Sequence, residues 1–370
     1  ILGDVFVSAL KAIAPLLVFF LVVSSLCNAG KSHGGVIKTV IILYMFSTVL
    51  AAVIAVFASM AFPVKMTLAN AATDTSAPQG IVEVLNNLLL NVVANPVSSL
   101  VNANYVGILM WAVLLGLAFR AADKMTKKVL ADVADGISMV VTWIINLAPF
   151  GIFGLVFNTV STNGLDIFTT YGKLLLLLVG CMLFIYFVTN PLLVYWCIRQ
   201  NPYPLIFHCL KRSALTAFFT RSSAANIPVN MKVCEEMGLD RDTYSVTIPL
   251  GATINMDGAA ITITVMTMAT AFTLGIHVDI PTAIILSLLA ALSACGASGV
   301  AGGSLLLIPM ACSLFGISDD ISMQVVAVGF IIGVVQDSVE TALNSSSDLL
   351  LSASAEFRQW RLEGKEIKFK

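Results

Sequence analysis

Charged residues are scarce in this sequence. Asp, Glu, Lys and Arg make up only 11% of its 370 residues, whereas a typical soluble domain has about 25%. Hydrophobic residues make up 58% of the chain. The net charge of -1 provides no basic field for nucleic acid. The composition therefore excludes an ordinary soluble domain and a nucleic-acid-binding protein, and it indicates that lipid surrounds most of the chain.

Motifs for metal, redox and hydrolytic chemistry are also lacking. The seven cysteines are scattered through apolar stretches without a CxxC pair, and the three histidines have no zinc-ligand spacing. We interpret the cysteines as small buried hydrophobic residues. An intramembrane protease with Asp257 and Asp337 as its catalytic pair is an alternative. It is disfavoured because neither aspartate lies in a GxGD motif, and no GxSxG motif is accompanied by a membrane-embedded His that would support a serine protease.

Seven apolar runs are long enough to cross a bilayer, which takes about 20 helical residues. They lie near 5–26, 36–62, 104–119, 137–160, 172–198, 243–275 and 322–352. Two further apolar stretches, 203–234 and 281–315, are interrupted by FFTRSSAANIPVN and SACGASGVAGGS. Each of the two predicts a helix, a polar tip and a second helix that returns to the same side of the membrane.

The distribution of Lys and Arg predicts the orientation of these segments. With seven crossings and two returning hairpins, most of the 20 cations fall on one side. Their segments are 27–38, 120–130, 199–212, 232–242 and the C-terminal tail. The positive-inside rule therefore predicts a cytoplasmic C-terminus. GLDRD at 238–242 and GISDD at 316–320 follow hairpins that start from opposite sides, which predicts inverted repeats unless the similarity is accidental.

A first polar cluster interrupts the crossing at 243–275. Asn255 and Asp257 lie between Gly251 and Gly258 in the segment GATINMDGAA. Local unwinding there would expose backbone carbonyls beside an amide and a carboxylate, a set of hard oxygens suited to an alkali cation. An ionised Asp at the bilayer centre costs about 2.5 to 3.5 kcal/mol on insertion scales. A hydrogen bond between packed helices is the alternative explanation.

A second polar cluster lies in the last crossing. Asp337, Thr341, Asn344 and Asp348 are spaced i, i+4, i+7 and i+11, which places them on one helical face, and Glu340 borders that face. We expect the first acid to bind an ammonium group, Thr341 and Asn344 to bind polar substrate atoms, and the last acid to bind sodium. A purely structural network is the alternative.

The hairpin tips and one earlier crossing supply further polar groups. Arg221, Ser222 and Ser223 lie where one helix ends and another begins, and free backbone donors at such ends attract a carboxylate. The small residues at 293–304 could offer the same, or could serve only close helix packing. Polar residues in the crossing at 36–62 have helix packing as their default role. They are Tyr44, Ser47 and Thr48.

These segments resemble one family over essentially the whole chain, the dicarboxylate/amino acid:cation symporters or glutamate transporter homologues. The resemblance rests on four segments. They are RSSAANIPVN, IPLGATINMDG, GASGVAGGS and DSVETALNSSSD. It implies an all-α integral membrane protein with transmembrane helices, two re-entrant helical hairpins and inverted repeats. The first helix of the family is absent, which fits an upstream natural start before Ile1.

The same resemblance implies a domain organisation and a homotrimer. A scaffold would comprise residues 1–35 and 81–160, and a transport unit would comprise 36–62 and 172–355. Residues 63–80 would form an extracellular loop and 356–370 a cytoplasmic tail. In this family the transport unit moves across the membrane like an elevator, with the second hairpin as the extracellular gate.

The resemblance also implies binding residues. The substrate pocket would consist of Ser222, Ser223, Val300, Asp337, Glu340, Thr341 and Asn344. One sodium site would use Gly251, Asn255, Asn344 and Asp348. A second sodium site would use the backbone of Thr253, Met256, Ala294 and Ala297. A third would use Tyr44, Ser47, Thr48, Asn255 and Asp257.

Two positions depart from the family pattern. Glu340 stands where members with acidic substrates carry an arginine, and a second carboxylate there would repel an acidic substrate. We therefore expect sodium-coupled import of L-serine and L-threonine across a bacterial cytoplasmic membrane. An alanine-like carrier and an ion channel are the alternatives. Gly333 replaces an acid of other members, so the number of coupled sodium ions stays open.

Overall fold

The computed structural model describes residues 2–28, 35–68, 90, 93–102, 104–147, 149–151, 153–154, 157, 161, 167–295 and 302–367. Within these ranges the chain is helical and contains no strand. The helices of the first half are α1 (Leu2–Asn28), α2 (Gly35–Ala61), α4 (Pro96–Val101), α5 (Tyr105–Phe119), α6 (Lys124–Asn146), α8 (Ile167–Phe184), the π-helical η1 (Ile185–Thr189) and α9 (Asn190–Ile198). Those of the second half are α10 (Tyr203–Cys209), the π-helical η2 (Leu210–Ala214), α11 (Leu215–Thr220), α12 (Ser223–Glu236), α13 (Arg241–Ile254), α14 (Asp257–Thr273), α15 (Ile280–Ala294), the 3-10 helix η3 (Gly303–Leu307), α16 (Ile308–Ser313) and α17 (Asp319–Leu362).

Four helical segments have the length and apolar composition to cross a membrane. They are Gly35–Ala61, Thr169–Ile198, Arg241–Thr273 and Asp319–Leu362. These correspond to four of the predicted crossings, and α1 covers a fifth with 27 residues. Helix α5 has only 15 residues, fewer than the roughly 20 that a perpendicular crossing needs. The chain is therefore a multi-pass membrane protein, as the composition indicates.

The start predicted for the crossing at 137–160 was wrong. Helix α6 begins at Lys124, inside the segment 120–130 that the charge pattern assigned to a loop. The Asp123 carboxylate accepts a hydrogen bond of 2.8 Å from the backbone N–H of Thr126, as an N-cap does. The first half of α6 is polar on one face, so hydropathy marks where the helix becomes apolar and not where it begins.

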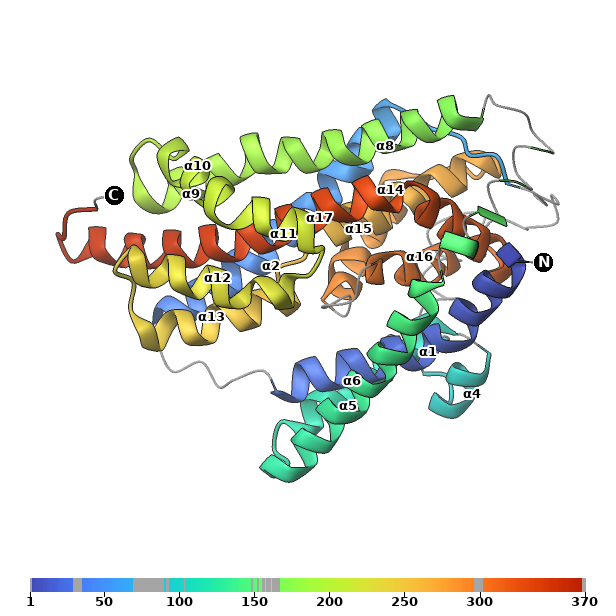
Figure 1. The fold of residues 1–370 in the computed structure, drawn as a ribbon, viewed down its shortest axis with the longest axis horizontal. Coiled ribbons are helices and arrows are strands. Elements are labelled where there is room, and N and C mark those ends of the chain that lie inside the picture. Colours follow the sequence, from blue (N-terminus) through green and yellow to red (C-terminus); the bar gives the residue numbers. More distant parts are fainter. Residues whose placement is uncertain are drawn as a thin grey trace.

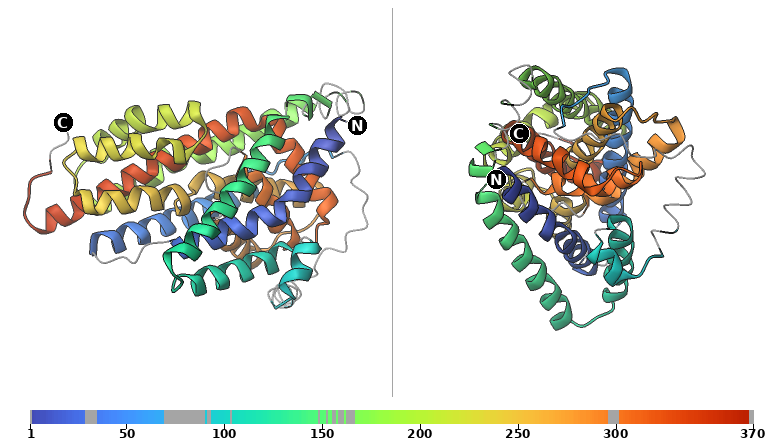
Figure 2. Two further views of the ribbon diagram at one scale, coloured as in Figure 1. Left: turned by 60° about the horizontal axis from the view of Figure 1, so that its bottom comes forward. Right: turned by 90° about the vertical axis from the view of Figure 1, so that its right-hand side faces the viewer.

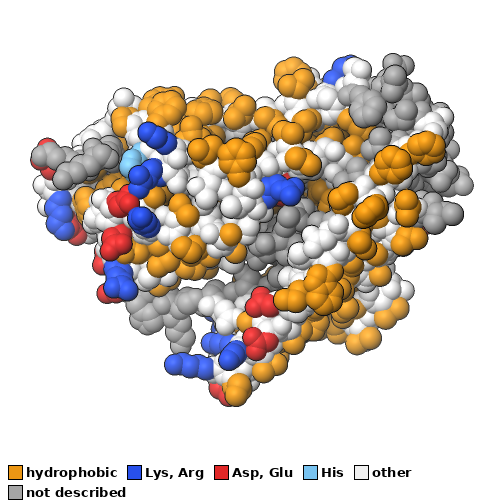
Figure 3. Space-filling model, in the orientation of Figure 1, with side chains coloured by type: hydrophobic (Ala, Val, Ile, Leu, Met, Phe, Trp, Pro, Cys, Tyr) orange, Lys and Arg blue, Asp and Glu red, His pale blue; other side chains and the backbone are white. Residues whose placement is uncertain are grey.

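The helices form two groups (Figure 1). Helices α5 and α6 each pack against α1, and α4 packs on α5. The remaining helices form a larger bundle around α17, which is visible from two further directions in Figure 2. The groups also touch, since the rings of Phe6 in α1 and Phe330 in α17 meet edge to face with centroids 5.4 Å apart. Figure 3 shows apolar side chains over much of one face, with charged side chains gathered near the C-terminus and at the far end of α5 and α6.

Helix α17 forms the axis of the larger bundle. It has 44 residues and packs against α2, α8, α9, α11, α12, α13, α14 and α16. Most of its side chains between Ile321 and Phe357 are buried, including many polar ones. Because buried polar groups require partners, the neighbouring helices must supply hydrogen bonds along most of its length.

The helix that was expected to unwind does so. Helix α13 ends at Ile254, α14 begins at Asp257, and Asn255 and Met256 between them have non-helical backbone angles. Two glycines let neighbouring helices approach this break. A Cβ on Gly251 would lie 2.8 Å from the Asp348 carboxyl carbon and from the Tyr44 hydroxyl. A Cβ on Gly258 would lie 2.9 Å from the Cα of Glu340.

Two helix pairs turn back on themselves. In the first, α10, η2 and α11 run to Arg221, which adopts a left-handed conformation with φ 50°, and α12 returns against η2 and α11. In the second, η3 and α16 return against α15. The tip of the second pair, residues 296–301, lies outside the described residues, and so do Ala297 and Val300 of the predicted sites. Residues 69–80 of the predicted extracellular loop also lie outside them.

Candidate functional site

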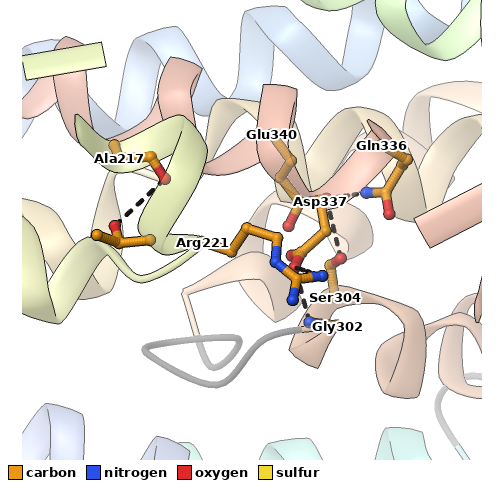
Figure 4. Close-up of polar contacts among 8 residues, drawn as sticks. Ala217, Arg221, Gly302, Ser304, Gln336, Asp337 and Glu340 are labelled. Carbon is orange, nitrogen blue, oxygen red and sulfur yellow. Dashed lines mark hydrogen bonds and ion pairs between the residues drawn. The ribbon is translucent and has the colours of Figure 1, made fainter. Parts of the chain in front are cut away.

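Both helix pairs meet α17 at Asp337 (Figure 4). The Asp337 Oδ2 atom lies 4.0 Å from the guanidinium of Arg221, at the turn of the first pair. The backbone N–H of Gly302, at the start of η3 in the second pair, donates a hydrogen bond of 3.2 Å to Asp337 Oδ1. The Asp337 side chain is 8% exposed and that of Arg221 is 42% exposed. A nearly buried carboxylate therefore lies between two turns and is not enclosed in a tight ion pair.

Glu340 is fixed by three donors from different parts of the chain. Its Oε2 atom accepts hydrogen bonds from the hydroxyls of Thr262 in α14 at 2.7 Å and Ser304 in η3 at 2.9 Å. The side-chain amide of Gln336 donates to the same oxygen. Among the described residues, no donor is found for the other oxygen, Oε1. The Glu340 carboxylate is therefore held in one orientation with one acceptor atom unused.

The polar face of α17 continues toward the break between α13 and α14. Thr341, one turn beyond Asp337, is 6% exposed. The Asn344 Oδ1 atom accepts a hydrogen bond of 2.7 Å from the backbone N–H of Gly258. The first turn of α14 and α17 are thus linked at the residue predicted to bind both the substrate and sodium.

The first turn of α12 has backbone N–H groups for which the described residues provide no acceptor. Ser222 is the N-cap, and its hydroxyl accepts a hydrogen bond of 3.2 Å from the backbone N–H of Ala225. The N–H groups of Ser223 and Ala224 lie in the first turn, where no carbonyl of the helix is in position to accept a hydrogen bond from them. This arrangement suits a carboxylate, as the sequence predicts for Ser222 and Ser223.

The predicted site of Gly251, Asn255, Asn344 and Asp348 contains two unpaired oxygens. The Asn255 amide donates a hydrogen bond of 2.9 Å to Asp348 Oδ1 and a longer one of 3.4 Å to the Asn344 carbonyl. The remaining oxygens, Asn255 Oδ1 and Asp348 Oδ2, are buried without a hydrogen-bond partner in the described part of the chain. Two orphaned buried oxygens from an amide and a carboxylate fit the ligand preference of sodium.

A separate cluster surrounds Asp257. Ser47 and Thr48 of α2 donate hydrogen bonds of 2.7 and 3.1 Å to its two carboxylate oxygens. Tyr44, which the resemblance placed in the same site, has different partners. Its hydroxyl lies 2.9 Å from the Asp348 carbonyl oxygen and 2.9 Å from the Ser352 hydroxyl. Helix α2 therefore contacts both acids, through different residues.

The remaining predicted set lies where α15 approaches the break. Thr253, Met256 and Ala294 belong to the described residues. The Thr253 hydroxyl donates a hydrogen bond of 2.7 Å to the backbone carbonyl of Leu250. The thiol of Cys295, next to Ala294, lies 3.6 Å from the carbonyl oxygen of Ile254. The end of α15 is therefore next to loosened backbone, although Ala297 of the same set is not described.

A buried network that the sequence did not single out joins the first helix pair to α17. The Asn226 side-chain amide donates hydrogen bonds of 3.0 Å to the Ser213 hydroxyl and 2.9 Å to the Ser345 hydroxyl. The Asn230 amide donates 2.9 Å to the Ser345 carbonyl. The signal in the sequence was the i, i+4 spacing of the two asparagines in NIPVN, and Ser345 directly follows Asn344. Thr262, Ser304 and Gln336 were missed as well, although the last lies one turn before Glu340.

The whole arrangement belongs to a known family. The chain matches the model of the sodium:dicarboxylate symporter family over residues 1–356. It belongs to that family. A curated protein of Bifidobacterium adolescentis, the serine/threonine transporter SstT, is 60% identical over 366 residues, which are 99% of this chain and 85% of that protein. The predicted family is confirmed, and the chain is a membrane transporter and not a protease.

Proposed function

We propose that this chain is a sodium-coupled symporter that imports L-serine and L-threonine. The observation that carries the substrate assignment is the Glu340 carboxylate. Its Oε2 atom accepts three hydrogen bonds, and no donor to its Oε1 atom is found among the described residues. An acidic substrate would place a second negative charge beside it. A hydroxyl group can instead donate a hydrogen bond to Oε1. The name of the 60% identical relative, a serine/threonine transporter, supports the same substrates.

The other parts of an amino acid have matching partners along α17. Asp337 would bind the ammonium group, with Thr341 beside it. The free N–H groups at the start of α12 and the side chain of Asn344 would bind the carboxylate. One sodium ion would bind between Asn255 Oδ1 and Asp348 Oδ2, whose unpaired state supports this assignment. Asp257 with Ser47 and Thr48 would form another cation site.

The proposal includes the topology and the assembly. The Lys and Arg distribution favours a cytoplasmic C-terminus in a bacterial inner membrane. The grouping of α1, α5 and α6 apart from the bundle around α17 is compatible with a scaffold at 1–35 and 81–160 and a moving unit at 36–62 and 172–355. The family resemblance favours a homotrimer with elevator movement.

Uptake by reconstituted vesicles tests the proposal. Labelled serine should accumulate above its outside concentration when sodium is added outside, and uptake should saturate. Equal uptake in potassium would contradict the coupling, and uptake that neither saturates nor exceeds equilibrium would favour a channel. Strong competition by aspartate would contradict the exclusion of acidic substrates.

The role of Glu340 separates a serine carrier from an alanine-like carrier. A hydrogen bond to a charged group contributes about 1.5–3 kcal/mol, so the wild type should prefer serine over alanine by about 10- to 150-fold. Glu340→Ala should reduce this ratio to near one, and Glu340→Gln should keep part of it through the amide oxygen. A wild-type ratio near one would favour the alanine-like carrier. An unchanged ratio in Glu340→Ala would show that the hydroxyl binds elsewhere.

A further inference from the structure

A large apolar groove lies between α2 and α8, away from the site around α17. Its volume is about 840 Å³, and its walls come from the second half of α2, the residues directly after it, and α8. Three aromatic residues on these walls, Phe57, Phe62 and Phe184, are each about half exposed or more, at 53%, 69% and 47%. The groove is therefore open on the outside of the protein and accessible to a long apolar ligand.

Small residues widen this groove, and one of them, Gly180, does not serve helix packing. Ala58, Ala61 and Gly180 are among its lining residues. A Cβ added to Gly180 would meet no heavy atom within 4 Å, so no neighbouring helix requires a glycine there. This differs from Gly251 and Gly258, where a Cβ would collide with side-chain or backbone atoms. The space beside Gly180 is consequently available to a molecule that is not part of the chain.

One end of the groove carries a charge. Of the described residues that line it, Lys173 alone is charged, and it is the first lining residue of α8, whereas Phe184 is the last. The 11 helical steps from Lys173 to Phe184 correspond to about 16 Å at 1.5 Å per residue. This length is close to half of the roughly 30 Å hydrocarbon core, so the groove has the depth of one leaflet.

The charged end lies where α2 ends and α8 begins. Both of these helix ends are at the same end of the molecule, the right-hand side in Figure 1. Phe62, Pro63 and Val64, which follow α2, line the groove together with Lys173. Among the described residues, no ion-pair partner is found for Lys173. The groove therefore combines an unpaired cation at one membrane boundary with an apolar channel leading inward.

We propose that this groove binds an anionic phospholipid, with its phosphate at Lys173 and one acyl chain along α8 toward Phe184. An acyl chain that enters the groove stays in contact with apolar atoms over its whole length. The lysine at the boundary attracts a lipid with net negative charge, and one such contact corresponds to roughly fivefold in affinity. The site is distinct from the amino acid and sodium sites proposed above and does not depend on them.

Lipid competition on the purified full chain tests this proposal. The chain in detergent is given equal amounts of phosphatidylglycerol and phosphatidylcholine, and native mass spectrometry measures which lipid stays bound. We expect about a fivefold preference for phosphatidylglycerol in the wild type. Lys173→Gln should abolish the preference, whereas Lys38→Gln, a change of an exposed lysine on the opposite end of α2, should keep it.

A second variant separates the groove from general lipid binding. Gly180→Phe places a side chain into the groove and should reduce the retention of both lipids, with little cost to an exposed helix position. Equal retention of the two lipids by the wild type would overturn the proposal. A preference that persists in Lys173→Gln would also overturn it, since the lipid would then be held elsewhere on the surface.

Discussion

Substitution of Gly258 by Ala tests whether close contact between α14 and α17 controls ligand binding. A Cβ at this position would lie 2.9 Å from the Cα of Glu340 and 3.0 Å from its carbonyl oxygen. Both are backbone atoms, so no side-chain rotation can relieve the contact. The helices must separate, and the hydrogen bond of 2.7 Å from the Gly258 N–H to Asn344 Oδ1 must lengthen or break.

The magnitude follows from the cost of overpacking. Extra methyl groups in a packed core cost about 1–3 kcal/mol. If the binding arrangement bears this cost, half-saturation concentrations for sodium and serine should rise by about 5- to 150-fold. The matched control is Gly172→Ala in α8, where an added Cβ meets nothing within 4 Å. There we expect unchanged uptake, and stability equal to or up to about 1 kcal/mol above the wild type because alanine favours helix.

Sodium-dependent serine uptake into vesicles and thermal unfolding of the purified chain give the two readouts. The reasoning is refuted if Gly258→Ala keeps both half-saturation values within twofold of the wild type. It is equally refuted if Gly172→Ala shows the same loss, because the effect would then reflect any glycine replacement and not the specific contact.

Three further substitutions test the individual sites. Asp337→Asn should abolish serine uptake in the same vesicles, and wild-type uptake would remove the ammonium role. Asp348→Asn should raise the sodium concentration for half-maximal uptake at least tenfold, because the variant lacks the negative charge beside Asn255 Oδ1. An unchanged sodium concentration would show that sodium binds elsewhere. Asn226→Ala removes the two short hydrogen bonds to the Ser213 and Ser345 hydroxyls and should lower the unfolding free energy by about 1–3 kcal/mol. Denaturation of the purified chain would detect this shift, and an unchanged stability would show that the network contributes nothing.

The break in the helix at 255–256 was predictable because its cause is local. An Asn and an Asp in an apolar run, with glycines on both sides, favour unwinding over a continuous helix. The four long crossings were predictable for a similar reason, since length and hydropathy are properties of a single segment. The start of α6 was not, because a polar amphipathic turn does not differ in hydropathy from a loop.

Partners distant in sequence could not be predicted from spacing. Nothing in the order of residues indicates that Asn226 binds Ser345, which is 119 positions away. The resemblance grouped Tyr44 with Asp257, but the Tyr44 hydroxyl lies beside the Asp348 carbonyl. Such pairs depend on how the helices rotate about their axes, which packing of the whole bundle decides. Spacing within one helix gave the polar face of α17, and only the fold gave its partners.

The buried acids explain why transport should depend on sodium. Asp257, Glu340 and Asp348 each accept hydrogen bonds from hydroxyl or amide groups, and in the described part of the chain none of them has an ion-pair partner. The neighbouring acid Asp337 has the guanidinium of Arg221 at 4.0 Å. An ionised acid in the middle of a membrane costs about 2.5–3.5 kcal/mol on insertion scales.

An amino acid cannot offset that cost alone. In the proposed binding mode, a zwitterionic amino acid would bring a positive charge to Asp337 and an equal negative charge to the start of α12, so the net charge of the core would be unchanged. Sodium at the proposed sites beside Asp348 or Asp257 would change it. A core with ions and substrate bound would then be closer to neutral than one with substrate only, and movement of the proposed transport unit through lipid would become less costly. In the proposed mechanism this difference would couple the two solutes, and it predicts that removing either Asp348 or Asp257 weakens coupling before it weakens folding.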